Sequence, residues 1–300
     1  MSDAARAWAR RLGPIGLWMH DLERLTATAA RDLVRTVESL GFPAIWIPES
    51  LGSKEIFAHA SLLLSATEKL IVASGIANIW ARDPVAMANG ARALVDAYPD
   101  RFLLGIGVSH APTVTARGQH TYGRPLDYMK RYLDAMEVAP YVGPKVEVPK
   151  VLAALGPQML TLAAERTFGA HSYFVPVEHT SLARKTLGDG PLLVVEQAAV
   201  LSEDAAVSRQ AARRHMKRYL ELDNYTNNLR RLGWSEELAN GGSDRLVDAI
   251  VAWGDSKAVR ARLDEHRRRG ADHVCLQMLR ADPAAPPTRD LETIAKAFSL

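Results

Sequence analysis

The stretch that decides the fold is Asp100-Arg-Phe-Leu-Leu-Gly-Ile-Gly-Val-Ser-His110. Its short apolar run is interrupted by two glycines and followed by the polar pair Ser109 and His110. The pattern predicts a buried strand whose carboxyl end presents backbone and an imidazole to a ligand. Apolar runs near residues 78 and 156 end in a similar way. Because a barrel builds its active site from such strand ends, we expect one site where they meet.

Strand-like and helix-like segments alternate from one end of the chain to the other. Near-continuous apolar runs predict strands at residues 13–18, 44–47, 70–77, 102–107, 151–155, 170–175, 192–200 and 273–279. Apolar residues at helical spacing predict helices at residues 22–40, 57–67, 84–98, 125–138, 157–168, from 179, 203–222 with Ser202 as cap, 243–253, 256–269 and 288–298. Strands that are apolar on both faces belong to a parallel sheet covered by helices.

The expected fold is therefore an α/β (β/α)8 TIM-like barrel. Its length of 300 residues suits one such barrel, whose typical size is roughly 250 residues. No linker divides the chain, so residues 1–300 are expected to form a single domain. The polar segment 224–242 breaks the alternation and predicts a helical insertion between the seventh and eighth strands. The alternative is an open doubly wound sheet, but the glycine fingerprint that fold requires does not follow the first strand.

Composition excludes several classes of function. The 37 basic and 34 acidic residues give a net charge of only +3, and no basic patch interleaved with aromatics predicts nucleic-acid binding. No apolar run reaches the about 20 residues that span a membrane. Cys275 is the only cysteine, and the start of the chain lacks the apolar segment of a signal peptide, so we expect a cytoplasmic protein. No His, Asp and Glu set has metal-ligand spacing, so no metal is expected.

Three separated motifs resemble the bacterial luciferase-like superfamily. They are Gly75-Ile-Ala-Asn-Ile79 with Arg82-Asp-Pro84, Arg101-Phe-Leu-Leu-Gly-Ile-Gly107, and Leu155-Gly-Pro-Gln-Met159. The stretch Gly270–Gln277 is similar to the eighth strand of that superfamily. The branch that uses the deazaflavin coenzyme F420 is the most similar, and residues 223–229 add to this. The resemblance implies a TIM-like barrel, a flavin-type ring at its carboxyl face, hydride transfer at C5 of the deazaflavin, and a homodimer.

The resemblance also implies a set of cofactor-binding residues. A helix that begins at Pro157 suits a phosphate, because its first N–H groups are free and carry the positive end of the dipole. The predicted phosphate residues are Leu155, Gly156, Pro157, Gln158 and Met159. The predicted ring contacts are Ala77, Asn78 and Ile79, with a cis peptide between the last two, and the backbone wall of Gly107, Val108 and Ser109.

Three residues at strand ends are candidates for catalysis. His110 occupies a position where related deazaflavin dehydrogenases often have an acidic Glu, and histidine can do acid–base chemistry near neutral pH. Glu49 matches an acidic position that in those relatives precedes a histidine, whereas Ser50 follows it here. That departure favours reduction of an enone or imine over oxidation of an alcohol. His20 could replace the missing imidazole. Trp80, Arg82, Tyr173 and His179 are further candidates, each equally or better explained by a structural role.

The leading hypothesis is an F420-dependent oxidoreductase acting on a small organic substrate. The alternative is an FMN-dependent luciferase-like monooxygenase that uses reduced flavin and dioxygen. A third hypothesis is a non-catalytic barrel that only binds a flavin. The substrate depends on variable loops, among them residues 111–123, which we expect to close over the ring.

Overall fold

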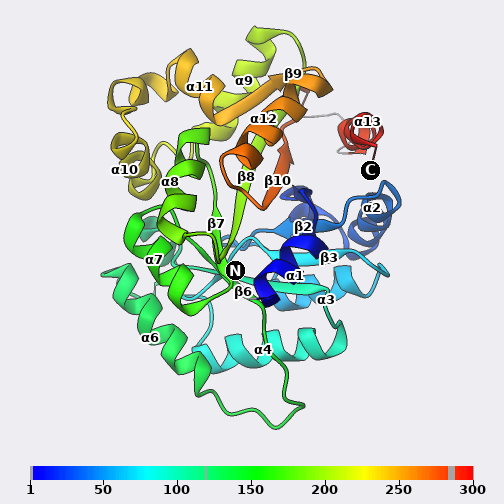
Figure 1. Ribbon diagram of the computed structural model, residues 1–300, viewed down its shortest axis with the longest axis vertical. Coiled ribbons are helices and arrows are strands. Elements are labelled where there is room, and N and C mark those ends of the chain that lie inside the picture. Colours follow the sequence, from blue (N-terminus) through cyan, green and yellow to red (C-terminus); the bar gives the residue numbers. More distant parts are fainter. Residues whose placement is uncertain (1–2, 119, 283–287, 300) are drawn as a thin grey trace.

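The computed structural model describes residues 3–118, 120–282 and 288–299. Within these residues, eight parallel strands form a closed barrel, because β10 pairs with both β8 and β1 (Figure 1). The barrel strands are β1 (Ile15–Trp18), β2 (Ala44–Ile47), β3 (Ile71–Ser74), β5 (Phe102–Gly107), β6 (Lys150–Ala153), β7 (Gly169–Ser172), β8 (Leu192–Leu201) and β10 (His273–Met278). The predicted TIM-like barrel is confirmed, and the open-sheet alternative is wrong.

Helices surround the barrel (Figure 1). They are α1 (Asp3–Leu12), α2 (Ala27–Ser39), α3 (Ile56–Leu64), α4 (Pro84–Ala97), α5 (Ala111–Ala116), α6 (Pro125–Glu137), α7 (Pro157–Arg166), α8 (Val177–Leu187), α9 (Ala205–Met216), α10 (Asp223–Arg231), α11 (Asp244–Ile250), α12 (Ser256–Arg268) and α13 (Thr288–Phe298). Asp204, not the predicted Ser202, caps α9, because its Oδ1 accepts the free N–H groups of Ala206 and Val207. No helix in the described part of the chain is long and apolar enough to cross a membrane.

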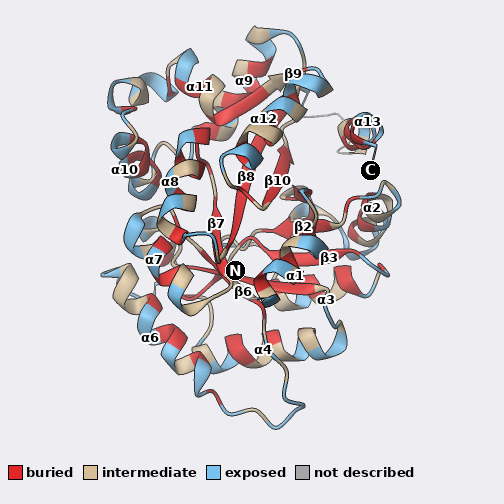
Figure 2. Cartoon of the chain, in the orientation of Figure 1, coloured by how far each residue is buried: buried red, intermediate tan, exposed pale blue. Residues whose placement is uncertain are grey.

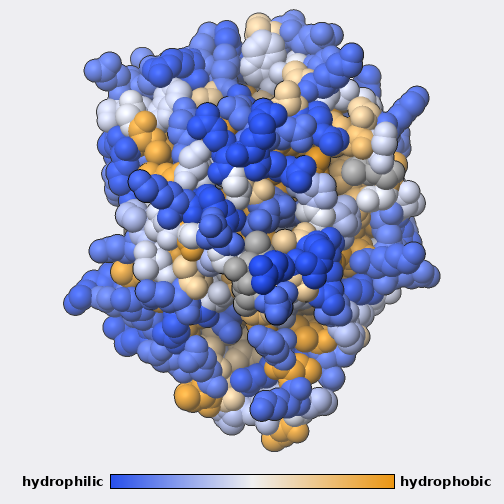
Figure 3. Space-filling view, in the orientation of Figure 1, coloured by the Kyte–Doolittle hydropathy of each residue, from blue (hydrophilic) through white to orange (hydrophobic). Residues whose placement is uncertain are grey.

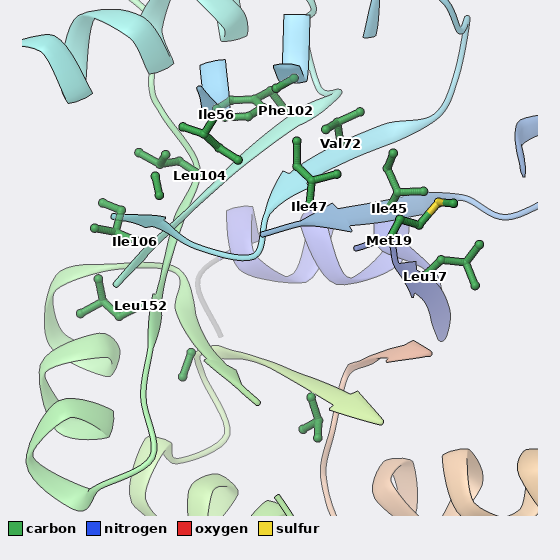
Figure 4. Packing of buried hydrophobic residues seen from close by; sticks show 14 of the residues in the cluster. Leu17, Met19, Ile45, Ile47, Ile56, Val72, Phe102, Leu104, Ile106 and Leu152 are labelled. Atoms are coloured by element: carbon green, nitrogen blue, oxygen red, sulfur yellow. The ribbon is translucent and has the colours of Figure 1, made fainter. Parts of the chain in front are cut away.

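The strands bury both of their faces (Figure 2). Leu17, Ile45 and Leu104 belong to the core cluster that strands share with the surrounding helices (Figure 4). Their neighbours Trp18, Trp46 and Leu103 belong to a second cluster, which fills the barrel. The division follows from the two-residue period of a strand, which sends successive side chains to opposite faces. Trp18 of this inner cluster, and Tyr173 packed against it, line the cavity described below.

Several elements differ from the sequence predictions. The helix expected to reach residue 253 ends at Ile250, and β9 (Val251–Gly254) follows and pairs with the far end of β8. The strand expected at residues 70–77 ends at Ser74, and β4 (Ala77–Asn78) resumes pairing with β5. Short apolar runs do not separate helix from strand by periodicity, which explains the first error. The helix α1 was not predicted; its buried Trp8 and Leu12 join the cluster inside the barrel.

The segment expected as an insertion contains α10 and a 3-10 helix at Ser235–Gly241. Leu229 and Trp234 of this segment pack in a separate apolar cluster with residues of β8, α9 and α11. On the face shown in Figure 3, hydrophilic side chains cover most of the surface and apolar residues lie in small separate groups. The insertion is thus anchored by its own core while its polar residues remain available at the barrel mouth.

Candidate active site

A cavity of about 400 Å³ lies at the carboxyl ends of the barrel strands and continues under the insertion. This volume is within the range of small-molecule sites. Most of the predicted site residues line it, namely His20, Glu49, Gly107, Val108, Ser109, His110, Leu155, Gly156 and Met159. The barrel therefore brings residues that are more than 100 positions apart in sequence to one cavity.

Five predicted cofactor residues do not line the cavity. Ala77, Asn78 and Ile79 are buried beside it, and Pro157 and Gln158 are exposed. Gly75 and Ile76 form this part of the wall instead. The expected cis peptide after Asn78 is wrong, because no peptide bond among the described residues is cis. Ordinary strand pairing explains this, since Asn78 pairs with Gly107 and the N–H of Ile79 donates to the Gly107 carbonyl at 3.2 Å.

Glycines keep this wall flat. A Cβ at Gly107 would lie 2.6 Å from Cδ1 of Ile76, and a Cβ at Gly75 would collide with the Trp18 ring. The backbone can therefore be approached closely by a planar ligand only while these positions lack side chains. The flat cradle has room for a flavin-type ring, and the ring contacts of residues 107–109 stay a prediction.

Glu49 is held in a buried ion pair. Its carboxylate pairs with the Arg82 guanidinium, and its Oε2 accepts the backbone N–H of Asn78 at 2.7 Å. The side chains of Glu49 and Arg82 are 5% and 10% exposed. Arg82 does not line the cavity, and neither does Trp80, whose indole N–H donates to the Val108 carbonyl at 2.9 Å. These contacts stabilise the wall, so the structure favours a positioning role for Glu49.

His110 presents to the cavity a ring nitrogen that has no hydrogen-bond partner among the described residues. Its Nδ1 lies 2.9 Å from Oδ1 of Asn224 in α10, and its ring packs against Tyr225. An amide oxygen only accepts, so Nδ1 carries the hydrogen and Nε2 keeps its lone pair in the neutral ring. Burial lowers the pKa of His110. The residue is thus a neutral base at physiological pH.

His20 forms a second acid–base group with Glu23, which sequence reasoning missed. Nδ1 of His20 lies 3.1 Å from Oε2 of Glu23, three residues later in a short 3-10 helix. Burial raises the pKa of Glu23 to about 7 and lowers that of His20. The pair can therefore gain or lose a proton near neutral pH beside the cavity. The i,i+3 spacing was the available signal.

The turn after α9 and the insertion together supply a cationic wall that the sequence did not predict. Arg218, Asn227 and Arg231 line the cavity. A Cβ placed on Gly156 would be 3.0 Å from Nη1 of Arg231, so this guanidinium covers the first turn of α7. Neither arginine has a carboxylate within ion-pairing distance in the described part of the chain. Arg231 therefore places a cation without a carboxylate partner, among the described residues, beside the N-terminus of α7, and this combination suits an anion.

Tyr173 and His179 differ in their placement. Tyr173 lines the cavity, packs on Trp18, and shares hydrogen bonds with Tyr219 and Gln277. The expectation of a core role for Tyr173 is thus wrong in part. His179 is buried, and its Nε2 contacts the Leu155 carbonyl at 2.9 Å, as expected for a structural residue. Cys275 is buried within β10.

The chain belongs to the family of luciferase-like monooxygenases, whose model matches residues 13–273. The chain is 23% identical over 206 residues to the 5,10-methylenetetrahydromethanopterin reductase of Methanolobus tindarius. That match covers 59% of this chain and 63% of the reductase, so the chain spans less than two thirds of that relative.

Two solved structures share the fold. An F420-dependent secondary alcohol dehydrogenase in complex with an F420–acetone adduct superposes with a TM-score of 0.77 at 16% identity, covering 94% of this chain and 97% of that one. The oxygenating constituent of 3,6-diketocamphane monooxygenase from Pseudomonas putida, in complex with FMN, gives a TM-score of 0.67 at 17% identity, covering 94% and 96%. At these identities the likeness shows the fold alone.

Proposed function

We propose that the protein is a coenzyme F420-dependent oxidoreductase that transfers a hydride between the deazaflavin C5 and a small organic substrate. The observation that carries the proposal is the shape and charge of the cavity at the carboxyl ends of the strands. Its glycine-lined wall at Gly75 and Gly107 leads to the start of α7 beneath Arg231. A planar ring would fit against the glycine wall, and a phosphate joined to it would reach the start of α7. The shared fold with an F420-dependent secondary alcohol dehydrogenase supports the deazaflavin in particular.

The residues present can hold such a coenzyme. Gly75, Ile76 and the backbone of residues 107–109 would contact the ring, and Leu155, Gly156 and Arg231 would bind its phosphate. When bound, the coenzyme would donate or accept the hydride, while the protein binds, orients and excludes water. Nε2 of His110 would take a proton from a substrate hydroxyl during oxidation and return it during reduction. Glu49 would hold the wall through Arg82, and the His20–Glu23 pair would buffer a second proton.

An FMN-dependent monooxygenase is the second candidate. The FMN-bound structure with the same fold favours it, because the glycine wall and the phosphate end would suit FMN as well. The two candidates differ in their reaction with oxygen. We would supply reduced F420 with enones, imines and ketones, oxidised F420 with alcohols, and reduced FMN with dioxygen. Turnover of F420 with an acceptor or an alcohol is expected. Oxygen-dependent product with FMN alone would overturn the proposal.

We also propose a cytoplasmic homodimer that binds no nucleic acid. The single cysteine and the small net charge support this proposal, as does the family resemblance for the dimer. Light scattering on the purified protein tests the dimer, because a monomeric mass at micromolar concentration would contradict it. The expected loop at residues 111–123 contains α5 at Ala111–Ala116, whereas residue 119 lies outside the described residues. Protection of this segment from proteolysis by the coenzyme would support closure.

A further inference from the structure

One polar side chain on the cavity floor has no partner. His171 of β7 lines the cavity, is 1% exposed, and is stacked between the rings of Trp18 and Trp46 at centroid distances of 5.3 and 4.9 Å. Neither of its ring nitrogens has a hydrogen-bond partner among the described residues. Burial lowers the pKa of His171 to about 3, so the ring is neutral. A neutral imidazole offers one donor and one acceptor.

His273 provides an internal comparison. It is also buried inside the barrel, and its ring contacts Trp46 at 6.1 Å. Its Nε2, however, accepts the indole N–H of Trp46 at 3.1 Å, and its Nδ1 contacts the Gly13 carbonyl at 2.8 Å. It does not line the cavity. His273, whose ring nitrogens both have hydrogen-bond partners, is away from the cavity. His171, whose nitrogens have none among the described residues, faces it.

We infer that His171 is a ligand-binding residue that hydrogen-bonds a neutral polar group between two tryptophans. Buried polar groups without partners reduce stability, so such a histidine is retained where a ligand completes its hydrogen bonds. The stacked tryptophans and the apolar surroundings disfavour a charged group at this depth. The ligand group is therefore a carbonyl, an amide N–H or a hydroxyl. It belongs either to the coenzyme ring or to the substrate, and on this point the inference rests on the proposed function.

The test compares His171→Phe, His171→Asn and His273→Phe with the unchanged protein. Loss of one ligand hydrogen bond should weaken binding about tenfold in His171→Phe, and Asn should restore part of it. A change in the dissociation constant of F420, followed by its fluorescence, assigns the contact to the coenzyme. An unchanged constant with a tenfold higher KM assigns it to the substrate. His273→Phe should leave both quantities unchanged.

Thermal unfolding without any ligand gives an independent readout. His171→Phe should change Tm by less than about 2 °C or raise it, because no hydrogen bond is lost. His273→Phe should lower Tm by roughly 4 °C or more, because the buried Trp46 indole and the part-buried Gly13 carbonyl lose their hydrogen-bond partner. If His273→Phe does not fold, His273→Gln serves as the control.

Two results would overturn the inference. One is a loss of Tm in His171→Phe equal to that of the His273 variant, since it would reveal a structural partner. The other is unchanged coenzyme affinity and unchanged KM in His171→Phe. Failure of the unchanged protein to bind F420 or FMN would instead contradict the proposed function, and the Tm comparison would still decide whether His171 is kept without a structural partner.

Discussion

The two sides of the cavity are built differently. The strand wall (Gly75, Ile76, Gly107, Val108 and Ala153) belongs to the barrel and takes its shape from strand pairing and glycines. The insertion wall (Arg218, Tyr219, Asn224, Asn227 and Arg231) comes from the turn after α9 and from α10 and carries exposed polar groups and two cations. The strand wall therefore favours a flat ligand group, whereas the insertion wall favours a negatively charged one. Changes in the first should affect stability, and changes in the second should affect affinity.

The largest effect is expected behind the strand wall, at Arg82. Arg82→Met would leave the Glu49 carboxylate buried without its cation, and breaking a buried pair in this way costs about 3–5 kcal/mol. Denaturant unfolding would measure this change. Glu55→Gln is the matched control, because Glu55 is the exposed partner of Arg82 and exposed pairs contribute about 1 kcal/mol or less. Equal stabilities of the two variants would contradict a rigid strand wall.

A pH effect is expected from Glu196, inside the barrel. Burial raises the pKa of Glu196 to about 8, so the folded protein keeps a proton that the unfolded chain loses above about 4.5. Stability therefore falls as pH rises through this window, by about 2–3 kcal/mol between pH 5 and 7. Glu196→Gln should flatten this decline in unfolding experiments. An unchanged slope in the variant would show that other groups dominate.

Adding one Cβ atom at each of two glycines compares the strand wall with the start of α7 beneath Arg231. Gly75→Ala places a Cβ against the Trp18 ring, and such overpacking costs about 1–3 kcal/mol and should abolish coenzyme binding. Gly156→Ala meets only the flexible end of Arg231, so its Tm should equal that of the unchanged protein. Thermal unfolding and F420 titration of both variants check this. A greater loss of stability in Gly156→Ala would reverse the comparison.

The smallest effect on stability is expected in the insertion wall. Arg231→Gln should change the free energy of unfolding by less than about 0.5 kcal/mol, as for surface substitutions. Its affinity for F420 should fall about tenfold, because a charge-assisted hydrogen bond to phosphate is lost. The loss should shrink at high salt, which screens the cation in the unchanged protein. If neither the substitution nor the salt changes the affinity for F420, the phosphate does not bind at this wall.

Sequence reasoning predicted the strand wall better than the insertion wall for a physical reason. Parallel strands bring their carboxyl ends together, so His20, Glu49 and His110 could be assigned to one site from their positions after apolar runs. The error at residues 77–79 arose because β3 stops at Ser74 and pairing resumes at Ala77, which moves the cavity wall to Gly75 and Ile76. A shift of one residue exchanges the two faces of a strand.

The remaining site residues depend on tertiary contacts without a local signal. Arg231 reaches the cavity because α10 lies over the start of α7, and Arg218 reaches it from the turn after α9. His171 lies in a short strand whose pattern gives no sign that its nitrogens lack partners. Glu196 is one acidic residue in an apolar run, and only the closed barrel makes it buried.

The most direct test is a titration of the purified protein with coenzyme F420 and with FMN, side by side, following the fluorescence of each. We predict micromolar or tighter binding of F420 and much weaker binding of FMN. Arg231→Gln, included as a third sample, should bind F420 about tenfold less tightly. A preference for FMN would contradict the deazaflavin assignment, and binding of neither would contradict a flavin-type site between the two walls.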